Sequence, residues 1–200
     1  MPVKLQQVEN LKKIAPESNG LIYSRVPLPK KRRTALDIGA FVGEWSNLLA
    51  EDFKVVVAFE VRENNRAMLR KNASPNVIVQ SIGLGRQIEM AEFVLRGAGP
   101  GGGRYAQHSS LGRSGPREVL PVMNLDAYGF DSVDLIKIDV DGSERDVIYG
   151  GVETFWRCKP PLVIETKFLN PWGKADLLRL INYRVHSKVS PIDEVWVARS

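Results

Sequence analysis

The segment Thr34–Glu60 limits the folds open to this chain more than any other stretch. Ala35–Ile38 is a short, mostly apolar run that is typical of a buried strand, and a turn bounded by two glycines, G-A-F-V-G, follows it. Glu44–Asp52 is compatible with a helix, and Lys54–Phe59 is a β-branched run that predicts a second strand. An acid, Glu60, follows the second strand directly. This order predicts the first half of a β-α-β unit with two parallel strands.

The glycine turn and the acid together predict a site for a ribose-bearing ligand. Glycine lets the backbone pass close to a ligand, and the first turn of the next helix offers free N–H groups. A carboxylate that ends the second strand, about 20 residues after the glycines, is placed to accept hydrogen bonds from ribose hydroxyls. The ordinary alternative is a glycine turn in a β-α-β unit that binds nothing.

The motif favours S-adenosylmethionine over a dinucleotide. Residues 37–43, D-I-G-A-F-V-G, carry two glycines, whereas a dinucleotide site has a third glycine where the pyrophosphate approaches the backbone. Asp37 would repel a phosphate, but its charge suits a ligand with an amine and a sulfonium. S-adenosylmethionine has both of these groups and no phosphate.

Composition indicates one globular domain without a membrane span. The chain has 200 residues, of which 44% are apolar. It has no apolar run near the roughly 18 residues that cross a bilayer, and its first ten residues lack the apolar core of a signal peptide. The single cysteine, Cys158, has no obvious base partner, so we expect an inert thiol in a reducing, cytoplasmic compartment. The net charge of +5 permits an anionic partner but does not indicate one.

Residues 1–33 are expected to form an N-terminal helix and a basic linker. Apolar side chains at steps of three and four predict an amphipathic helix over 3–15, which Pro16–Gly20 should end. Leu21–Val26 is predicted to be a short strand or an extended lead-in. The basic run Lys30–Arg33 is either a solvated lead-in to the first strand or a nucleic-acid patch.

Beyond Glu60 the chain alternates between helical and strand-like stretches, as in a doubly wound α/β fold. The stretches that predict helices are Glu63–Ala73, Asn124–Tyr128 as a short turn, Ser143–Arg157 with a break at Gly150–Gly151, and Lys174–Ile181. The stretches that predict strands are Val77–Ile82, Ile88–Leu95, Glu118–Met123, Asp134–Gly142, Leu162–Glu165, Tyr183–Val189 and Glu194–Ala198. Gly83–Gly85 is predicted to turn the chain after the third strand.

Arg96–Arg117 is rich in glycine and arginine and is too long for a simple turn. Loops of this length in compact domains are usually lids, binding loops or disordered segments. Arg104, Tyr105, His108 and Arg113 give the loop aromatic and cationic groups, so we expect it to cover a bound substrate. An insertion without a role is the alternative.

Charged residues gather where the predicted strand L-I-K-I-D-V-D-G ends. Side chains alternate along a strand, so Lys137, Asp139 and Asp141 are predicted to share one face near its carboxyl end. Ligands of open α/β sheets bind beyond the carboxyl ends of the strands, so both acids should face the crevice that Gly39 and Glu60 border. The alternative is a structural role, in which Asp139 pairs with Lys137 or Asp141 caps the next helix.

These motifs resemble the FkbM-type methyltransferases. The resemblance rests on L-D-I-G-A-F-V-G-E-W-S, V-V-V-A-F-E, L-D-A-Y, D-L-I-K-I-D-V-D-G-S-E and P-P-L-V-I-E, in this order. It implies a methyltransferase domain over 34–200 with the class I, Rossmann-like α/β fold. That fold has a seven-stranded, mostly parallel sheet with helices on both faces and a final antiparallel hairpin, and here a β-insertion near Ile88 and Glu118. The chain departs from the family at Asp141, where Glu is usual, and at Val61, where Pro is common.

The resemblance implies S-adenosylmethionine as the cofactor. Asp37 is expected to help hold the amino-acid end of the cofactor, through water or backbone, and Glu60 the ribose. The predicted cofactor-binding residues are Asp37, Gly39, Ala40, Phe41, Gly43, Glu60, Ser81 and Ile82. Asp139 is the first candidate for polarising the acceptor hydroxyl, His108 is the second, and Asp141 is expected to shape the catalytic site.

The acceptor is expected to be a hydroxyl on a sugar or another small molecule. One alternative is the 2′-hydroxyl of a nucleic acid, with Lys137, Asp139, Glu165 and Lys167 as the catalytic set. Another is a catalytically silent module that binds S-adenosylmethionine or NAD. No metal site is predicted, although the acids at this end of the sheet would together suit Mg²⁺.

Overall fold

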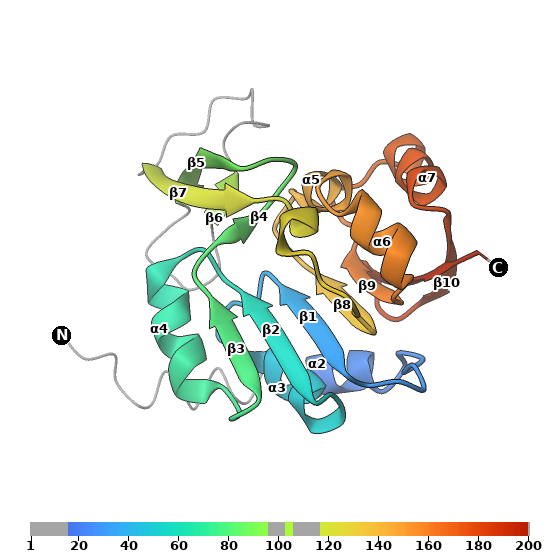
Figure 1. Ribbon diagram of the computed structural model, residues 1–200, viewed down its shortest axis with the longest axis horizontal. Coiled ribbons are helices and arrows are strands. Elements are labelled where there is room, and N and C mark those ends of the chain that lie inside the picture. Colours follow the sequence, from blue (N-terminus) through green and yellow to red (C-terminus); the bar gives the residue numbers. More distant parts are fainter. Residues whose placement is uncertain (1–15, 96–102, 106–116, 200) are drawn as a thin grey trace.

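The computed structural model describes residues 16–95, 103–105 and 117–199 (Figure 1). Its strands are β1 (Thr34–Ile38), β2 (Val55–Phe59), β3 (Val77–Gln80), β4 (Gly83–Leu84), β5 (Glu89–Leu95), β6 (Gly103–Tyr105), β7 (Arg117–Met123), β8 (Leu135–Ile138), β9 (Leu162–Glu165), β10 (Tyr183–Lys188) and β11 (Asp193–Ala198). Its helices are α2 (Pro16–Tyr23), α3 (Glu44–Asp52), α4 (Glu63–Asn72), the 3₁₀ helix η2 (Leu125–Tyr128), α5 (Glu144–Tyr149), α6 (Val152–Cys158) and α7 (Pro171–Leu180). No helix in these residues combines the length and the apolar character needed to span a bilayer.

Seven strands form the main sheet, in the order β10-β11-β9-β8-β1-β2-β3. Neighbours from β9 to β3 pair in parallel, whereas β11 runs antiparallel to both β9 and β10. The predicted sheet and its final antiparallel hairpin are therefore confirmed. Strands such as V-V-V-A-F and L-V-I-E are nearly continuous apolar runs because both faces of this sheet are buried.

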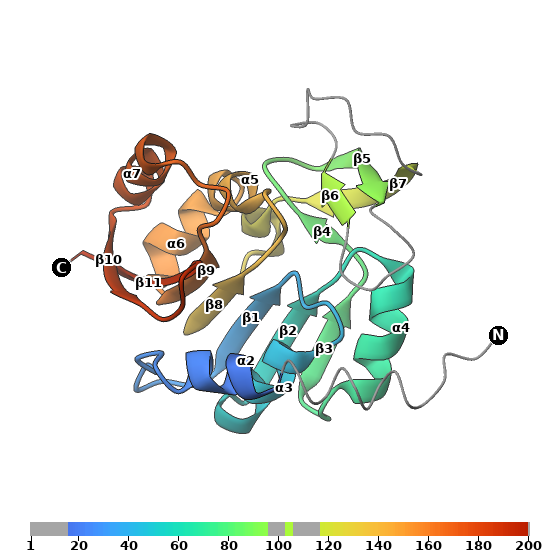
Figure 2. The ribbon, with the colours of Figure 1, turned by 180° about the vertical axis from the view of Figure 1, so that it is seen from behind.

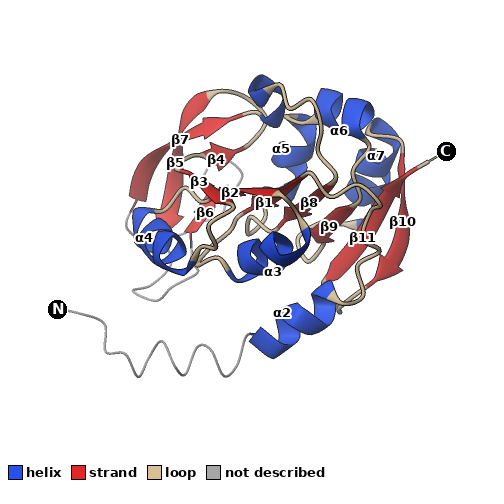
Figure 3. Ribbon diagram, turned by 60° about the horizontal axis from the view of Figure 1, so that its bottom comes forward, coloured by secondary structure: helices blue, strands red, loops and turns tan. Residues whose placement is uncertain are grey.

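Helices cover both faces of the main sheet. Figure 3 shows α2, α3 and α4 on one face and α5, α6 and α7 on the other. Alternate residues of the central strands divide between these faces. In β1, Leu36 packs in the cluster that contains Val147 of α5, whereas Ala35 packs in the cluster that contains Trp45 of α3. By the same alternation Asp37 shares the side of Ala35, which we call the α3 face.

A second, smaller sheet lies beyond the carboxyl ends of β1, β2 and β3 (Figures 1 and 2). Its strand order is β4-β7-β5-β6, with β5 antiparallel to both of its neighbours. Ala91, Phe93 and Val122 form its own small core, against which Val61 packs. Because Val61 comes soon after β2, this core joins the insertion to the edge of the main sheet where a ligand is expected. The predicted β-insertion is therefore confirmed.

Two predictions for the N-terminal region are wrong. Pro16–Gly20 does not end a helix but begins α2, and the first half of Leu21–Val26 continues that helix instead of forming a strand. Proline is favourable in the first turn of a helix, where no N–H is required. Contacts with α3 then hold the helix. The rings of Tyr23 and Trp45 pack edge-to-face with their centroids 5.8 Å apart, and the Tyr23 hydroxyl donates to Asp52 at 2.8 Å.

The glycine-containing segments also differ from the prediction. Gly83–Gly85 contains the two-residue strand β4, because it pairs in parallel with the end of β7. Within the predicted loop Arg96–Arg117, β6 pairs with β5, and β7 already begins at Arg117. The rest of that loop, including His108, lies outside the described residues, as does the predicted helix over 3–15.

Two cations of the basic linker are paired with acids. The side chain of Arg33 donates to both carboxylate oxygens of Asp134, at 3.0 and 2.6 Å, and its backbone N–H donates to the same group at 2.7 Å. Burial opposes ionisation of Asp134, but Arg33 holds the pKa of Asp134 below its usual range. Arg32 pairs with Asp52. These pairs attach the linker to the beginning of β8 and the end of α3, which favours the lead-in interpretation of Lys30–Arg33.

Candidate functional site

The site begins where three parallel strands end. The N–H groups of Gly39 and Ala40, just past β1, both donate to the carbonyl of Phe59 at the end of β2, each at 3.0 Å. The N–H of Asp139, just past β8, donates to the carbonyl of Ile38 at 3.0 Å. The loops that follow β1 and β8 are therefore in direct contact beside the end of β2.

The backbone of these two loops adopts conformations that few side chains permit. Gly39 has a φ of +83°, and a Cβ added to it would lie 1.9 Å from the carbonyl oxygen of Asp139. Phe41 and Asp141 also have positive φ, at 52° and 53°. Such conformations are costly for residues other than glycine and cluster at functional sites. Both loops are therefore candidates for contact with a ligand.

The loops border a cavity of about 300 Å³, which we name the Glu60 cavity. This volume is at the lower end of the range for small-molecule sites. The residues that line the cavity are Ile38, Gly39, Phe41, Phe59, Glu60, Val61, Arg62, Asn65, Gly83, Leu84, Gly85, Phe93, Asp139, Val140, Asp141, Ser143 and Asp146. Its wall therefore combines the ends of the main strands with the insertion, and acids with aromatic rings.

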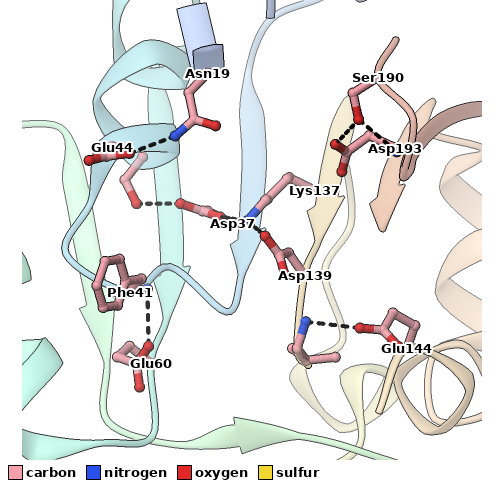
Figure 4. A network of polar contacts seen from close by, with 12 residues as sticks. Asn19, Asp37, Phe41, Glu44, Glu60, Lys137, Asp139, Glu144, Ser190 and Asp193 are labelled. Carbon is pink, nitrogen blue, oxygen red and sulfur yellow. Dashed lines mark hydrogen bonds and ion pairs between the residues drawn. The ribbon is translucent and has the colours of Figure 1, made fainter. Parts of the chain in front are cut away.

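Glu60 is held firmly at the wall of this cavity. The residue is 7% exposed, and its Oε2 accepts from the N–H of Phe41 at 3.0 Å (Figure 4). Its Oε1 accepts from the N–H of Arg62 at 2.8 Å. Burial raises the pKa of Glu60, and hydrogen bonds from Arg62, Asn65 and Phe41 oppose that rise. A carboxylate has about four acceptor positions, so Glu60 can still accept a hydrogen bond from a ligand hydroxyl in addition to these three.

A chain of charged groups runs along the α3 face from Asp37 to Asp139 (Figure 4). Asp37 and Lys137 are direct partners in β1 and β8, with Nζ 3.9 Å from Oδ1 of Asp37, and the Ser46 hydroxyl donates to Oδ2 at 2.6 Å. Lys137 Nζ also lies 3.1 Å from Oδ2 of Asp139, whose side chain is 43% exposed. Burial lowers the pKa of Lys137, but the charges of Asp139 and Asp37 outweigh burial and raise it. Lys137 is therefore a fixed positive charge that orients the carboxylate of Asp139.

A second hollow of about 380 Å³ lies on the α3 face, and we name it the Glu165 hollow. The residues that line it are Asn19, Ile22, Trp45, Asp139, Glu165, Ser190, Pro191, Ile192 and Asp193. Among the described residues, only Asp139 lines both this hollow and the Glu60 cavity. Figure 4 shows Asp139 between Glu60 on one side and Asp193 on the other. Groups bound in the two spaces could therefore meet beside Asp139.

Glu165, the last residue of β9, has a carboxyl group whose pKa lies above its ordinary value. The residue is 8% exposed, and its Oε2 is buried without a hydrogen-bond partner in the described structure. Burial raises the pKa of Glu165 to about 7, and the negative charges of Asp139, Glu144 and Asp141 contribute to the rise, against the opposing charge of Lys167. This carboxyl group therefore titrates near neutral pH. Despite these acids, no group of His, Cys, Asp and Glu in the described residues could hold a metal ion.

The structure brings together some of the residues predicted from the sequence and leaves others apart. The predicted residues that line the Glu60 cavity are Gly39, Phe41, Glu60, Asp139 and Asp141. The predicted cofactor residues that do not line it are Asp37, Ala40, Gly43, Ser81 and Ile82. Asp37 is fully buried under α3, because strand alternation turns it toward Ser46, and the exposed Ser81 accepts a hydrogen bond from Arg70 at 2.9 Å. His108 lies outside the described residues.

The residues of the cavity wall that sequence reasoning missed include Arg62, Asn65, Phe93 and Asp146. Arg62 and Asn65 come two and five residues after Glu60, so their proximity to the strand-end acid could have indicated them. Phe93 lies on β5 of the insertion, and Asp146 lies on α5. These two reach the cavity only through tertiary packing, and no local pattern in the sequence indicates them.

Comparison with known families identifies the domain. A profile of the Methyltransferase FkbM domain matches residues 37–184, from β1 to β10. The chain belongs to the FkbM methyltransferase family. S-adenosylmethionine is therefore the cofactor. All residues that line the Glu60 cavity lie within the matched segment, whereas Asn19, Ile22 and residues 190–193 of the Glu165 hollow lie outside it. A search of curated proteins gave no match.

Solved structures share the fold of this FkbM domain at low sequence identity. The FkbM methyltransferase from Methylobacillus flagellatus KT aligns with a TM-score of 0.61 and 17% identity, over 90% of this chain and 47% of that one. This chain thus spans about half the length of that protein. A ribosomal protein L11 methylase from Lactobacillus delbrueckii subsp. bulgaricus aligns with a TM-score of 0.55 and 12% identity, over 92% of this chain and 77% of that one. A precorrin-6y C5,15-methyltransferase from Geobacter metallireducens GS-15 aligns with a TM-score of 0.55 and 13% identity, over 92% of this chain and 88% of that one. These similarities establish the class I methyltransferase fold alone.

Replacing Gly39 by Ala should lower the free energy of unfolding by more than about 2 kcal/mol, because the Cβ would overlap the carbonyl of Asp139 in addition to straining a positive φ. Gly129→Ala is the matched control. Gly129 also has a positive φ, +59°, but nothing lies within 4 Å of its added Cβ, so its loss should be about 1 kcal/mol. Urea denaturation measures both losses. Equal losses would show that the close approach at Gly39 is not required.

The raised pKa of Glu165 predicts a pH-dependent effect on stability. Its pKa is about 7 in the folded protein against an ordinary value of 4.5, so the folded state binds this proton more tightly and loses stability as pH rises through that window. Glu165→Gln should therefore raise the free energy of unfolding by about 1–3 kcal/mol near pH 8 and change it little near pH 5. Glu51→Gln, at an exposed site on α3, should have little effect at either pH. Urea denaturation at both pH values measures these free energies of unfolding. An effect of Glu165→Gln that is the same at both pH values would contradict the raised pKa of Glu165.

Proposed function

We propose that this domain transfers the methyl group of S-adenosylmethionine to a hydroxyl of a sugar or another small molecule. The observation that carries this proposal is the position of Asp139. Asp139 borders both the Glu60 cavity and the Glu165 hollow, and its carboxylate lies 3.1 Å from the buried ammonium of Lys137. A base acts efficiently only when it is held within hydrogen-bond reach of the reacting hydroxyl, and this pairing holds Asp139 in place.

The Glu60 cavity has the groups that the cofactor requires. Glu60 would accept hydrogen bonds from the ribose hydroxyls, and the cofactor would lie against the backbone of Gly39, which lines the cavity. Phe93, from the insertion, offers an apolar surface for the adenine ring. Asp139 and Asp141 complement the positive charge of the sulfonium and amine. S-adenosylmethionine supplies an activated methyl group when it is bound.

Asp139 would accept the proton that the hydroxyl loses during methylation. A positioned base of this kind contributes about 10²–10⁴-fold to the rate. Lys137, held by Asp37, would keep the Asp139 carboxylate aimed at the acceptor, so Asp37 would act on the reaction indirectly. Asp141 would shape the cavity from the left-handed turn that follows. His108, on the loop outside the described residues, is a second candidate for the base.

The charges of the site favour a small molecule over a nucleic acid. A nucleic-acid acceptor needs cationic side chains along its phosphates. The Glu165 hollow instead has Asp139, Glu165 and Asp193 in its wall, and no Lys or Arg in the described part of the chain lines it. In the basic linker, Arg32 and Arg33 are already paired with acids. This distribution supports an acceptor without phosphate groups.

Glu60→Gln should weaken the binding of S-adenosylhomocysteine about 10- to 100-fold, because hydrogen bonds to a charged group are worth about 1.5–3 kcal/mol. Glu63→Gln is the matched control, since it removes an exposed carboxylate three residues later and should leave the affinity unchanged. Titration calorimetry measures both affinities. Wild-type affinity in Glu60→Gln would contradict the assignment of Glu60 to the ribose.

A methyl-transfer screen with labelled cofactor, against sugars, glycolipids, small hydroxylated compounds and RNA, tests the reaction itself. We expect label on a sugar or small hydroxylated compound. Asp139→Asn should lower that turnover by about 10²–10⁴-fold while changing the affinity for S-adenosylhomocysteine less than about threefold. Asp131→Asn, at an exposed site before β8, should behave as wild type. Label on RNA alone, or near-normal turnover by Asp139→Asn, would contradict the proposal.

A further inference from the structure

We infer that the Glu165 hollow binds the methyl acceptor and selects one that carries a protonated amine near its reacting hydroxyl. The amine would lie between the carboxylates of Glu165 and Asp193, and the hydroxyl would reach Asp139. The acceptor class is then an amino alcohol or an amino sugar. This inference rests on the proposed function and adds the chemical class of the substrate.

The first observation is that two acidic residues face each other across neighbouring strands. Glu165 and Asp193 are direct partners in the antiparallel pairing of β9 with β11. The Cβ atoms of such partners lie about 4.5–5.5 Å apart, and like charges in this position destabilise a sheet. Burial raises the pKa of both carboxyls, and the negative charge of Asp139 raises both further. A cation bound between the two side chains would remove this repulsion.

Among the described residues, three acids and no Lys or Arg line the hollow. The charge of Lys137 lowers the pKa of Asp193 and that of Lys167 lowers the pKa of Glu165, but the ion pairs of Lys137 are with Asp37 and Asp139. The Ser190 hydroxyl donates to Oδ2 of Asp193, whereas Oε2 of Glu165 is buried without a partner. A carboxylate oxygen this deeply buried needs a donor, and an ammonium group has three.

The rest of the wall favours an organic cation over a metal ion. Trp45, Ile22, Pro191 and Ile192 give the hollow an apolar side. The Trp45 ring already has Nζ of Lys137 over it, 5.8 Å from the ring centroid, so this side of the hollow offers apolar surface against which a carbon skeleton can be buried. Metal ions such as Mg²⁺ instead require several oxygen ligands, and no group of described acids meets that need. A volume of about 380 Å³ accommodates a molecule of the size of one sugar ring.

Three 4-substituted cyclohexanols test the inference on the enzyme saturated with S-adenosylhomocysteine. They are trans-4-aminocyclohexanol, trans-1,4-cyclohexanediol and trans-4-hydroxycyclohexanecarboxylic acid. The amine and the diol have the same number of heavy atoms and differ in charge, and the acid carries the opposite charge. Ligand-observed NMR titrations measure their affinities. We expect the amine to bind at least about tenfold more tightly than the diol, and the acid to bind more weakly than either. Equal affinities for the amine and the diol would overturn the inference.

Two variants locate the amine. Glu165→Gln should reduce the affinity for the amine to that for the diol and leave the affinity for the diol unchanged. Ile192→Arg places a cation at the wall of the hollow through a side chain that is 39% exposed, and it should also abolish the preference for the amine. Ile78→Arg is the matched control, because Ile78 is 50% exposed on β3, at the opposite edge of the sheet from β10. A preference for the amine that persists in both Glu165→Gln and Ile192→Arg would overturn the inference.

Failure of this inference is distinguishable from failure of the proposed function. Calorimetry with S-adenosylhomocysteine, run first on each protein, reports on the Glu60 cavity alone. Normal binding there without a preference for the amine overturns only the acceptor class. A third outcome is that the amine and the diol bind equally while Mg²⁺ changes the NMR spectrum of the protein. That result would overturn the inference and indicate a metal site instead.

Discussion

The contact between the loops after β1 and β8 is the constraint on which the rest of the site depends. Gly39 lies so close to the carbonyl of Asp139 that no side chain fits between them, while the N–H of Asp139 bonds to the carbonyl of Ile38. Gly39 also donates to Phe59, so three strands end at one point. The glycine is therefore required by a contact within the protein itself. It allows the wall of the Glu60 cavity, where we propose that the cofactor binds, and the residue proposed as the base to be built from touching backbones.

The same strand geometry explains why polar residues occupy the α3 face. Asp37, Lys137 and Glu165 stand at positions that alternate with the core residues beneath α5 and α6, so they share one side of the sheet. Their burial is not a strong source of stability, because desolvation offsets most of the gain from pairing buried charges. Proteins retain such arrangements mainly where function requires them. Here the arrangement ends at Asp139, which both the Glu60 cavity and the Glu165 hollow share.

Local patterns predict much of this architecture, and tertiary contacts decide the remainder. Apolar runs that end in a glycine or an acid identify the parallel strands. The same runs identify Gly39 and Glu60, two residues that line the Glu60 cavity. The helix α2 was missed because contacts with α3, distant in the sequence, hold it. Asp37 belongs to the same motif as Gly39, yet strand alternation turns it away from the cavity. The opposition of Glu165 and Asp193 exists only once β11 pairs with β9, so no pattern within either strand reveals it.

The structure of the protein bound to S-adenosylhomocysteine tests the central claim most directly. If the bend after β1, held against Asp139, seats the adenosyl group, the ribose hydroxyls will lie about 3 Å from the carboxylate of Glu60. The sulfur will then lie on the side of the cavity that Asp139 borders. An adenosyl group bound elsewhere, or a Glu60 that bonds only to Phe41 and Arg62 in the complex, would contradict the claim.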